Sequence, residues 1–155
     1  KGETDMITEK QIQLHSSAST QEGVFQAIAD LAVENGIAVD NASVVAGLKE
    51  RESLSTTGFQ DGFAIPHTQS DSITRPAIII VRTETGIEWE SFDGKPAFFF
   101  ISLLVPHEEA GTTHLQALAA LSRALMDDES RQAFLTAQSS EQLAHLIKNA
   151  IQGDE

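Results

Sequence analysis

The stretch Ala77-Ile78-Ile79-Ile80-Val81 decides the fold. Successive side chains of a strand point to opposite faces of its sheet, so five consecutive apolar residues put apolar groups on both faces. Residues 97–105 form a second segment of this kind, and Pro106 ends it. Two such segments predict a sheet that helices cover on both faces.

Shorter patterns around these segments predict the other elements. Alternating residues predict a first strand at 12–14, a short strand at 63–65 that Pro66 stops, and a half-exposed strand at 87–90 after a turn at Thr85-Gly86. Cap residues predict five helices. The first begins at Ser19 with Glu22 and ends at Asn35-Gly36, the second runs from Asp40-Asn41 to about Arg51-Glu52, and the others begin at Thr112-Thr113, at Asp128, and at Ser139 with Gln142.

These elements indicate an α+β fold with three layers, α/β/α, in which a mixed β-sheet is flanked by helices on both faces. The expected order of the main elements is β-α-α-β-β-β-α-α-α, to which the segment 87–90 adds a shorter strand. We expect residues 1–155 to form a single domain, with residues 1–9 loosely ordered and residues 152–155 beginning a linker.

Composition narrows the class of protein. The 155 residues include no cysteine, which excludes disulfides and thiolate chemistry and is compatible with the reducing cytoplasm, where we expect the protein. Ten Lys+Arg against 23 Asp+Glu give a formal net charge of −13, which repels nucleic acids and anionic membranes and attracts a basic protein partner. No apolar run reaches the ~20 residues of a membrane span, so we expect neither nucleic-acid binding nor membrane insertion.

Two of the five histidines have sequence surroundings that suit a catalytic or anion-binding role. His67 follows Pro66 at the end of a predicted strand, which fixes the direction of the ring while it still reaches solvent, as a nucleophile requires. His114 lies just inside a predicted helix, where free N–H groups and the helix dipole favour an anion such as a phosphoryl group and lower the pKa of a nearby histidine. The other three, His15, His107 and His145, fit a strand end, a solvated loop and the polar side of a helix.

The order of several motifs carries a resemblance to a known family. The motifs are Arg51-Glu52-Ser53-Leu54-Ser55-Thr56-Thr57-Gly58, Gly62-Phe63-Ala64-Ile65-Pro66-His67, Trp89 with Asp93-Gly94-Lys95-Pro96, and His114-Leu115-Gln116-Ala117-Leu118. Over residues 10–150 the chain resembles the enzyme IIA domain, fructose/mannitol type, of the bacterial sugar phosphotransferase system.

The resemblance implies a phosphocarrier. In that family the histidine at the position of His67 accepts a phosphoryl group from a phosphohistidine of the carrier HPr. It then passes the group to a IIB domain for uptake of a fructose-like sugar. Arg51 and His114 occupy the positions of the family's supporting residues. No cofactor and no metal ion is required, because the donor already carries the reactive bond. Asp61 stands where mannitol-type members have a glutamate, but its side chain is one methylene shorter, so its role stays open.

Elementary chemistry agrees with these roles. A neutral ring nitrogen attacks only if the other nitrogen holds the proton, so we expect a carbonyl or hydroxyl near Thr68 to accept that hydrogen bond. Arg51 offers a planar fork of donors to phosphoryl oxygens. Each residue also has a plainer interpretation: His67 as an ordinary strand-end histidine, and Arg51 as the partner of Glu50 or Glu52.

Alternatives to transport stay open at this point. Nitrogen-type relatives carry the same motifs and act by binding other proteins according to their phosphorylation state, and IIA-like modules also occur inside transcription regulators. A third alternative keeps the fold and loses the chemistry, as in the cytoplasmic domains of anion exchangers. The sequence identifies neither the sugar nor the oligomeric state.

Overall fold

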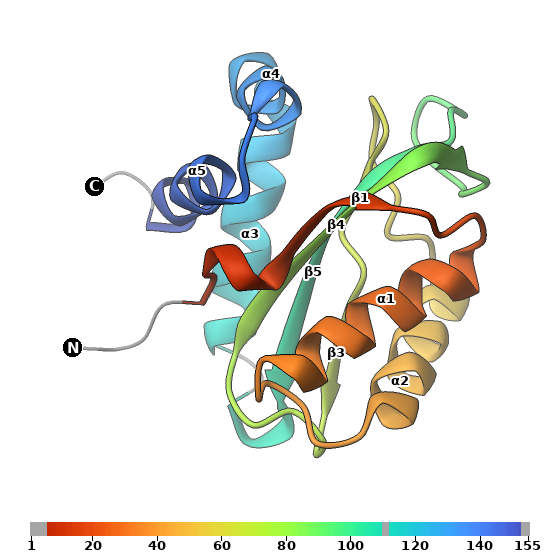
Figure 1. Cartoon of the computed structure of the whole chain (residues 1–155), viewed down its shortest axis with the longest axis vertical. Coiled ribbons are helices and arrows are strands. Elements are labelled where there is room, and N and C mark those ends of the chain that lie inside the picture. Colours follow the sequence, from red (N-terminus) through yellow and green to blue (C-terminus); the bar gives the residue numbers. More distant parts are fainter. Residues whose placement is uncertain (1–5, 110–111, 153–155) are drawn as a thin grey trace.

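The computed structural model describes residues 6–109 and 112–152, in which a five-stranded sheet lies between two groups of helices (Figure 1). Its elements in chain order are η1 (Glu9–Gln11), β1 (Ile12–Ser16), α1 (Gln21–Glu34), α2 (Asn41–Leu54), β2 (Phe63–Ala64), β3 (His67–Ser70), β4 (Ala77–Ile87), β5 (Ala97–Pro106), η2 (His107–Glu109), α3 (Thr112–Met126), α4 (Asp128–Thr136) and α5 (Ser140–Gln152). The predicted α/β/α architecture with a mixed sheet is confirmed.

Strand β5 organises the sheet. It pairs antiparallel with β4 on one side and parallel with both β2 and β3 on the other. β1 pairs parallel with β4, which gives the order β1-β4-β5-β2 with β3 also on β5. The sheet is therefore open and mixed, and its two longest strands lie side by side.

The apolar strands divide the core into two halves, as the sequence predicts. Ile79 and Val81 of β4 face the half formed with α1 and α2, whereas Ile78 and Ile80 face the half formed with α3, α4 and α5. Figure 1 shows these two groups of helices on opposite faces of the sheet. None of the helices in the described part of the chain has the length and apolar character needed to cross a membrane.

The strands between α2 and α3 are not all the expected ones. The described residues there form four strands, of which β3 (His67–Ser70), directly after Pro66, is not predicted. β4 continues through Thr85-Gly86 to Ile87, so the predicted turn and the predicted strand at 87–90 are wrong. The alternation in that segment has another cause: Trp89 is buried against the rings of Phe25 and Phe100.

One predicted helix start is displaced by one residue, and another is confirmed. The Thr20 hydroxyl, not that of Ser19, accepts the hydrogen bond from Gly23 N at the start of α1. Helix α4 begins at Asp128 as predicted, and the side chain of the preceding Asp127 caps it. α2 also runs to Leu54, beyond the predicted end. Asp40 and Ser139 accept the capping bonds of α2 and α5 as predicted, whereas the side chains of Thr112 and Thr113 lie outside the described residues.

Residues 6–9, expected to be loosely ordered, pack onto the sheet. Ile7 is fully buried, and Ile78 N donates a hydrogen bond to Met6 O at 2.8 Å. Residues 1–5 and 153–155, which include most of the predicted linker start, lie outside the described residues.

Two serine substitutions should change stability in opposite directions. Ser102 Oγ is fully buried in β5 and has no hydrogen-bond partner among the described residues, so Ser102→Ala should raise the free energy of unfolding by about 1 kcal/mol. Ser139 Oγ accepts a hydrogen bond from Gln142 N at 3.0 Å, so Ser139→Ala should lower the free energy of unfolding by about 1 kcal/mol. Urea unfolding of both variants measures the two changes. A loss of stability in Ser102→Ala would show that its hydroxyl is satisfied.

Candidate functional site

Arg51, His67 and His114 line one pocket of about 340 Å³. They belong to α2, β3 and α3, three elements that are distant from one another along the chain and meet at the pocket in the folded protein. The complete lining is Gly47, Glu50, Arg51, Leu54, His67, Thr68, Gln69, His107 and His114. A second, smaller pocket of about 160 Å³ is also lined by Arg51 and His67.

Helix α2 approaches β3 closely at this pocket. A Cβ on Gly47 would overlap the Thr68 hydroxyl. Arg51 follows Gly47 by four residues and therefore lies on the same helix face. The contact brings the Arg51 side chain within reach of β3.

The backbone around His67 is fixed by the sheet. β2 pairs Ala64 with Phe100, and β3 pairs His67 with Leu103, so the two strands continue one register across Ile65-Pro66. Pro66 has no N–H and interrupts the ladder, but its carbonyl accepts from Leu103 N at 3.0 Å. His67 therefore follows the short strand β2, as predicted, and also begins β3. Only 8% of its surface is exposed.

Two hydrogen bonds determine the tautomer of the His67 ring. Nδ1 lies 2.7 Å from the carbonyl oxygen of Ile65, which can only accept, so Nδ1 carries the proton. Arg51 Nε donates to Nε2 at 3.1 Å. The predicted acceptor is therefore a carbonyl, although it belongs to Ile65 and not to the neighbourhood of Thr68. Nε2 keeps its lone pair and faces the cationic guanidinium.

The surroundings keep both pocket histidines neutral. Burial lowers the pKa of His67 below its ordinary value of 6.5. The Ile65 carbonyl opposes this shift, and the charges of Arg51 and His114 add to it. Burial also lowers the pKa of His114, with a further contribution from Arg51. A neutral imidazole is the form that can act as a nucleophile.

Arg51 serves the pocket and not a neighbouring acid. Its Nη1 donates to the carbonyl of Ser55 at 2.9 Å, which together with the Nε bond to His67 fixes the plane of the guanidinium. The plainer interpretation, pairing with Glu50 or Glu52, is wrong: Arg51 forms an ion pair with neither in the described part of the chain, and the Glu52 carboxylate accepts its bonds from other groups.

Glu52 is a residue of the site whose role the sequence did not reveal. Its carboxylate accepts from Thr57 N, Thr57 Oγ1, Thr56 Oγ1 and Trp89 Nε1 at 2.7–3.2 Å. It thereby fixes the loop after α2, and Thr57 O in turn accepts from Ile65 N at 3.0 Å. The Arg51-Glu52 pair was visible in the sequence, but the contact with Trp89, 37 residues away, was not.

His114 completes the pocket from the third residue of α3. Its ring centroid lies 5.6 Å from that of His67, with the planes at 54°. Its Nδ1 is buried without a hydrogen-bond partner among the described residues. An unpaired buried polar atom is costly, so a group bound between the two rings would find an unused partner here.

The other predicted residues lie around the pocket or outside it. His107, expected in a solvated loop, is half exposed but also lines the pocket, and its Nδ1 lies 3.0 Å from Asp71 Oδ1. Asp61 lines neither pocket that contains His67, and its carboxylate is paired with Arg131. His15 lies near the end of β1, and His145 lies on the exposed side of α5, as predicted.

The lowered pKa values predict a pH dependence of stability. Because folded His67 and His114 titrate below 6.5, the unfolded chain binds more protons as the pH falls through that value. The free energy of unfolding should therefore fall from about pH 7 to about pH 5. NMR titration should place the midpoint of His67 below 6.5, and Arg51→Met should raise it without reaching 6.5. A midpoint above 6.5 in the folded protein would contradict the assignment.

Removing the charge of Glu52 should loosen the loop. Glu52→Gln replaces one acceptor oxygen by a donor amide, so the free energy of unfolding should fall by about 1–3 kcal/mol. Trp89 is the only tryptophan of the chain, so its fluorescence should change with the loss of its Nε1 bond. The neighbouring Glu50→Gln is the matched control and should stay within about 0.5 kcal/mol of the wild type. Equal effects of the two variants would contradict the role of Glu52.

Comparisons with known proteins identify the family. The model of the phosphoenolpyruvate-dependent sugar phosphotransferase system, EIIA 2, matches residues 5–150. The fructose-specific EIIA component of Haloferax volcanii is 35% identical over 141 residues, which are 91% of each chain.

Solved structures agree with this match. The nitrogen regulatory protein IIA-Ntr from Neisseria meningitidis superposes with a TM-score of 0.83 at 27% identity, covering 92% of this chain and 96% of the other. Enzyme IIA mannitol of Escherichia coli, in its complex with phosphorylated enzyme IIB mannitol, has a TM-score of 0.74 at 19% identity, covering 91% and 96%, and shares the fold. The chain belongs to the EIIA 2 family of the phosphoenolpyruvate-dependent sugar phosphotransferase system.

Proposed function

We propose that this chain is a phosphocarrier that accepts a phosphoryl group on His67 from phospho-HPr and passes it to a IIB domain for uptake of a fructose-like sugar. The observation that carries the proposal is the lone pair on Nε2 of a neutral, buried His67, held beside Arg51 and His114. The fructose-specific relative supports the choice of sugar class.

The pocket supplies what a transfer between two histidines needs. The lone pair of His67 Nε2 attacks the phosphorus atom of the donor phosphohistidine and forms a new N–P bond. The donor N–P bond breaks, and its electron pair stays on the donor nitrogen. The Arg51 guanidinium moves from the ring nitrogen to the phosphoryl oxygens, which it can bind with two parallel N–H groups. The unpaired Nδ1 of His114 lies in the same pocket as a further partner.

The surface around the pocket suits protein partners. Two of the six large apolar side chains that the described residues expose line these pockets, Leu54 the first and Phe92 the second. Exposed apolar groups around a polar site are typical of an interaction surface. The net charge of −13 favours a basic donor, and the mannitol neighbour has been solved with a IIB protein. The proposal includes a cytoplasmic location.

A regulatory role is the second candidate, and the superposition on IIA-Ntr favours it. In this case His67 carries the phosphoryl group as a signal, and the surface around it binds other proteins according to the state of the ring. The two candidates share the acceptor residue and differ in the fate of the phosphoryl group.

Phosphorylation by a purified donor system tests the shared step. Incubation with phosphoenolpyruvate, enzyme I and HPr should give acid-labile phosphate on the wild type and none on His67→Ala. Arg51→Ala and His114→Ala should slow the transfer, Arg51→Ala by roughly 10²-fold. The matched control is His145→Ala on the exposed part of α5, which should behave as the wild type. Label that survives in His67→Ala, or that requires ATP and magnesium, would overturn the proposal.

Transfer onward separates the two candidates. Added IIB protein and membranes containing the sugar permease should discharge the phosphorylated chain and yield phosphorylated fructose. Mannitol in place of fructose is the control substrate. A phosphorylated chain that no fructose-type IIB protein discharges would favour the regulatory role.

A further inference from the structure

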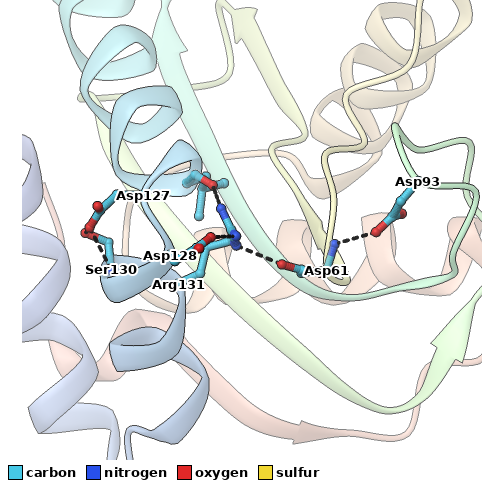
Figure 2. Close-up of polar contacts among 7 residues, drawn as sticks. Asp61, Asp93, Asp127, Asp128, Ser130 and Arg131 are labelled. Atoms are coloured by element: carbon cyan, nitrogen blue, oxygen red, sulfur yellow. Dashed lines mark hydrogen bonds and ion pairs between the residues drawn. The ribbon is translucent and has the colours of Figure 1, made fainter.

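A buried arginine outside the pocket joins helix α3, which carries His114, to the loop that leads to His67. Arg131 of α4 is only 7% exposed. Its Nε donates to Asp61 Oδ2 at 2.9 Å, its Nη1 donates to Leu125 O at 2.6 Å, and its Nη2 contacts the Asp128 carboxylate. Figure 2 shows the guanidinium between Asp61 on one side and α4 on the other. We name the contacts of Arg131 with Asp61 and Leu125 the Arg131 bridge.

The first arm of the bridge reaches helix α3. Leu125 is the penultimate residue of this helix, and His114 is its third. At 1.5 Å per residue the two are about 16 Å apart along a rigid helix. Holding the carbonyl of Leu125 therefore restricts how α3 can slide or rotate, and with it the position of the His114 ring.

The second arm reaches the turn that leads to His67. Asp61 and Gly62 have φ angles of 57° and 88°, in the left-handed region that costs a non-glycine residue about 1 kcal/mol. Asp61 N donates to Asp93 Oδ2 at 2.9 Å, as Figure 2 shows, while Arg131 holds the carboxylate. Such a conformation persists only where the surroundings fix it.

This turn is the tip of a loop that ends at the His67 ring. Phe59 N donates to Phe63 O at 2.8 Å, and Ile65 N donates to Thr57 O at 3.0 Å, so the two sides of the loop are paired from the tip to the base. At the base the Ile65 carbonyl fixes Nδ1 of His67. A displacement of the tip is therefore passed along paired backbone to the atom that sets the tautomer.

We propose that Arg131 is a positioning residue, which fixes α3 relative to the 57–65 loop through the Arg131 bridge and so sets the spacing of His114 and His67. A contribution to stability alone explains the buried arginine less well than a positioning role does. Burying a guanidinium costs desolvation energy, and an apolar side chain at the same position often stabilises a protein as much as a buried ion pair. The rate measurements below rest on the proposed function, whereas the ring signals do not.

A pair of matched variants tests the bridge. Asp61→Asn and Asp128→Asn each remove one carboxylate from the same guanidinium, but only Asp61 lies on the loop, and asparagine tolerates its positive φ. Asp61→Asn should slow transfer to His67 at saturating phospho-HPr by about tenfold, with the KM for the donor unchanged. It should also shift the ring ¹⁵N signals of His67 and His114. Asp128→Asn should match the wild type in both measurements.

Two further variants complete the test. Asp61→Glu keeps a carboxylate and should recover most of the lost rate. Arg131→Lys keeps the buried charge but cannot reach Asp61 and Leu125 together, so it should be as slow as Asp61→Asn, and it replaces that variant if the latter does not fold.

The bridge is overturned if Asp61→Asn or Arg131→Lys matches Asp128→Asn in rate and ring signals, or if Asp61→Glu is as slow as Asp61→Asn. Absence of label on the wild type would refute the proposed function instead, and the ring signals would still decide the bridge.

Discussion

The hydrogen bond between His67 Nδ1 and the Ile65 carbonyl is the constraint on which the site depends. A carbonyl accepts only, so the bond fixes the proton on Nδ1 and leaves the lone pair on Nε2. Arg51 Nε can donate a hydrogen bond to Nε2 only because the ring has this tautomer. The carbonyl is itself immobile, because Ile65 N bonds Thr57 O and the flanking residues pair with β5. Sheet geometry thus determines a protonation state.

The general fold could be predicted because it depends on local patterns. The two apolar segments predict strands covered on both faces, and β4 and β5 are those strands. β3 escaped prediction because His67-Thr68-Gln69-Ser70 is polar and has no alternation, and its strand geometry comes from pairing with β5. Residues 88–90 gave the opposite error, since their alternation reflects the burial of Trp89 and not a ladder of backbone bonds.

The site could be predicted only in part, and for a similar reason. Arg51, His67 and His114 were identified from motifs and a family resemblance, and the structure places them in one pocket. The residues whose contacts support this pocket could not be identified from the sequence. Glu52 contacts Trp89 37 residues away, and Arg131 contacts Asp61 70 residues away. No local pattern encodes such pairs, because their separation is set by the folded path of the chain.

The close contact between Gly47 and Thr68 has a consequence for the reach of Arg51. A helix normally stands off a sheet by the thickness of its side chains, but here one position on α2 carries none. A methyl group there would have to displace either the threonine or the helix axis, and the guanidinium would move outward with the axis, away from the ring nitrogen. By permitting this short separation of α2 and β3, Gly47 helps to keep the guanidinium beside the His67 ring one helical turn away, so interlayer spacing contributes to the electrostatic environment of the imidazole.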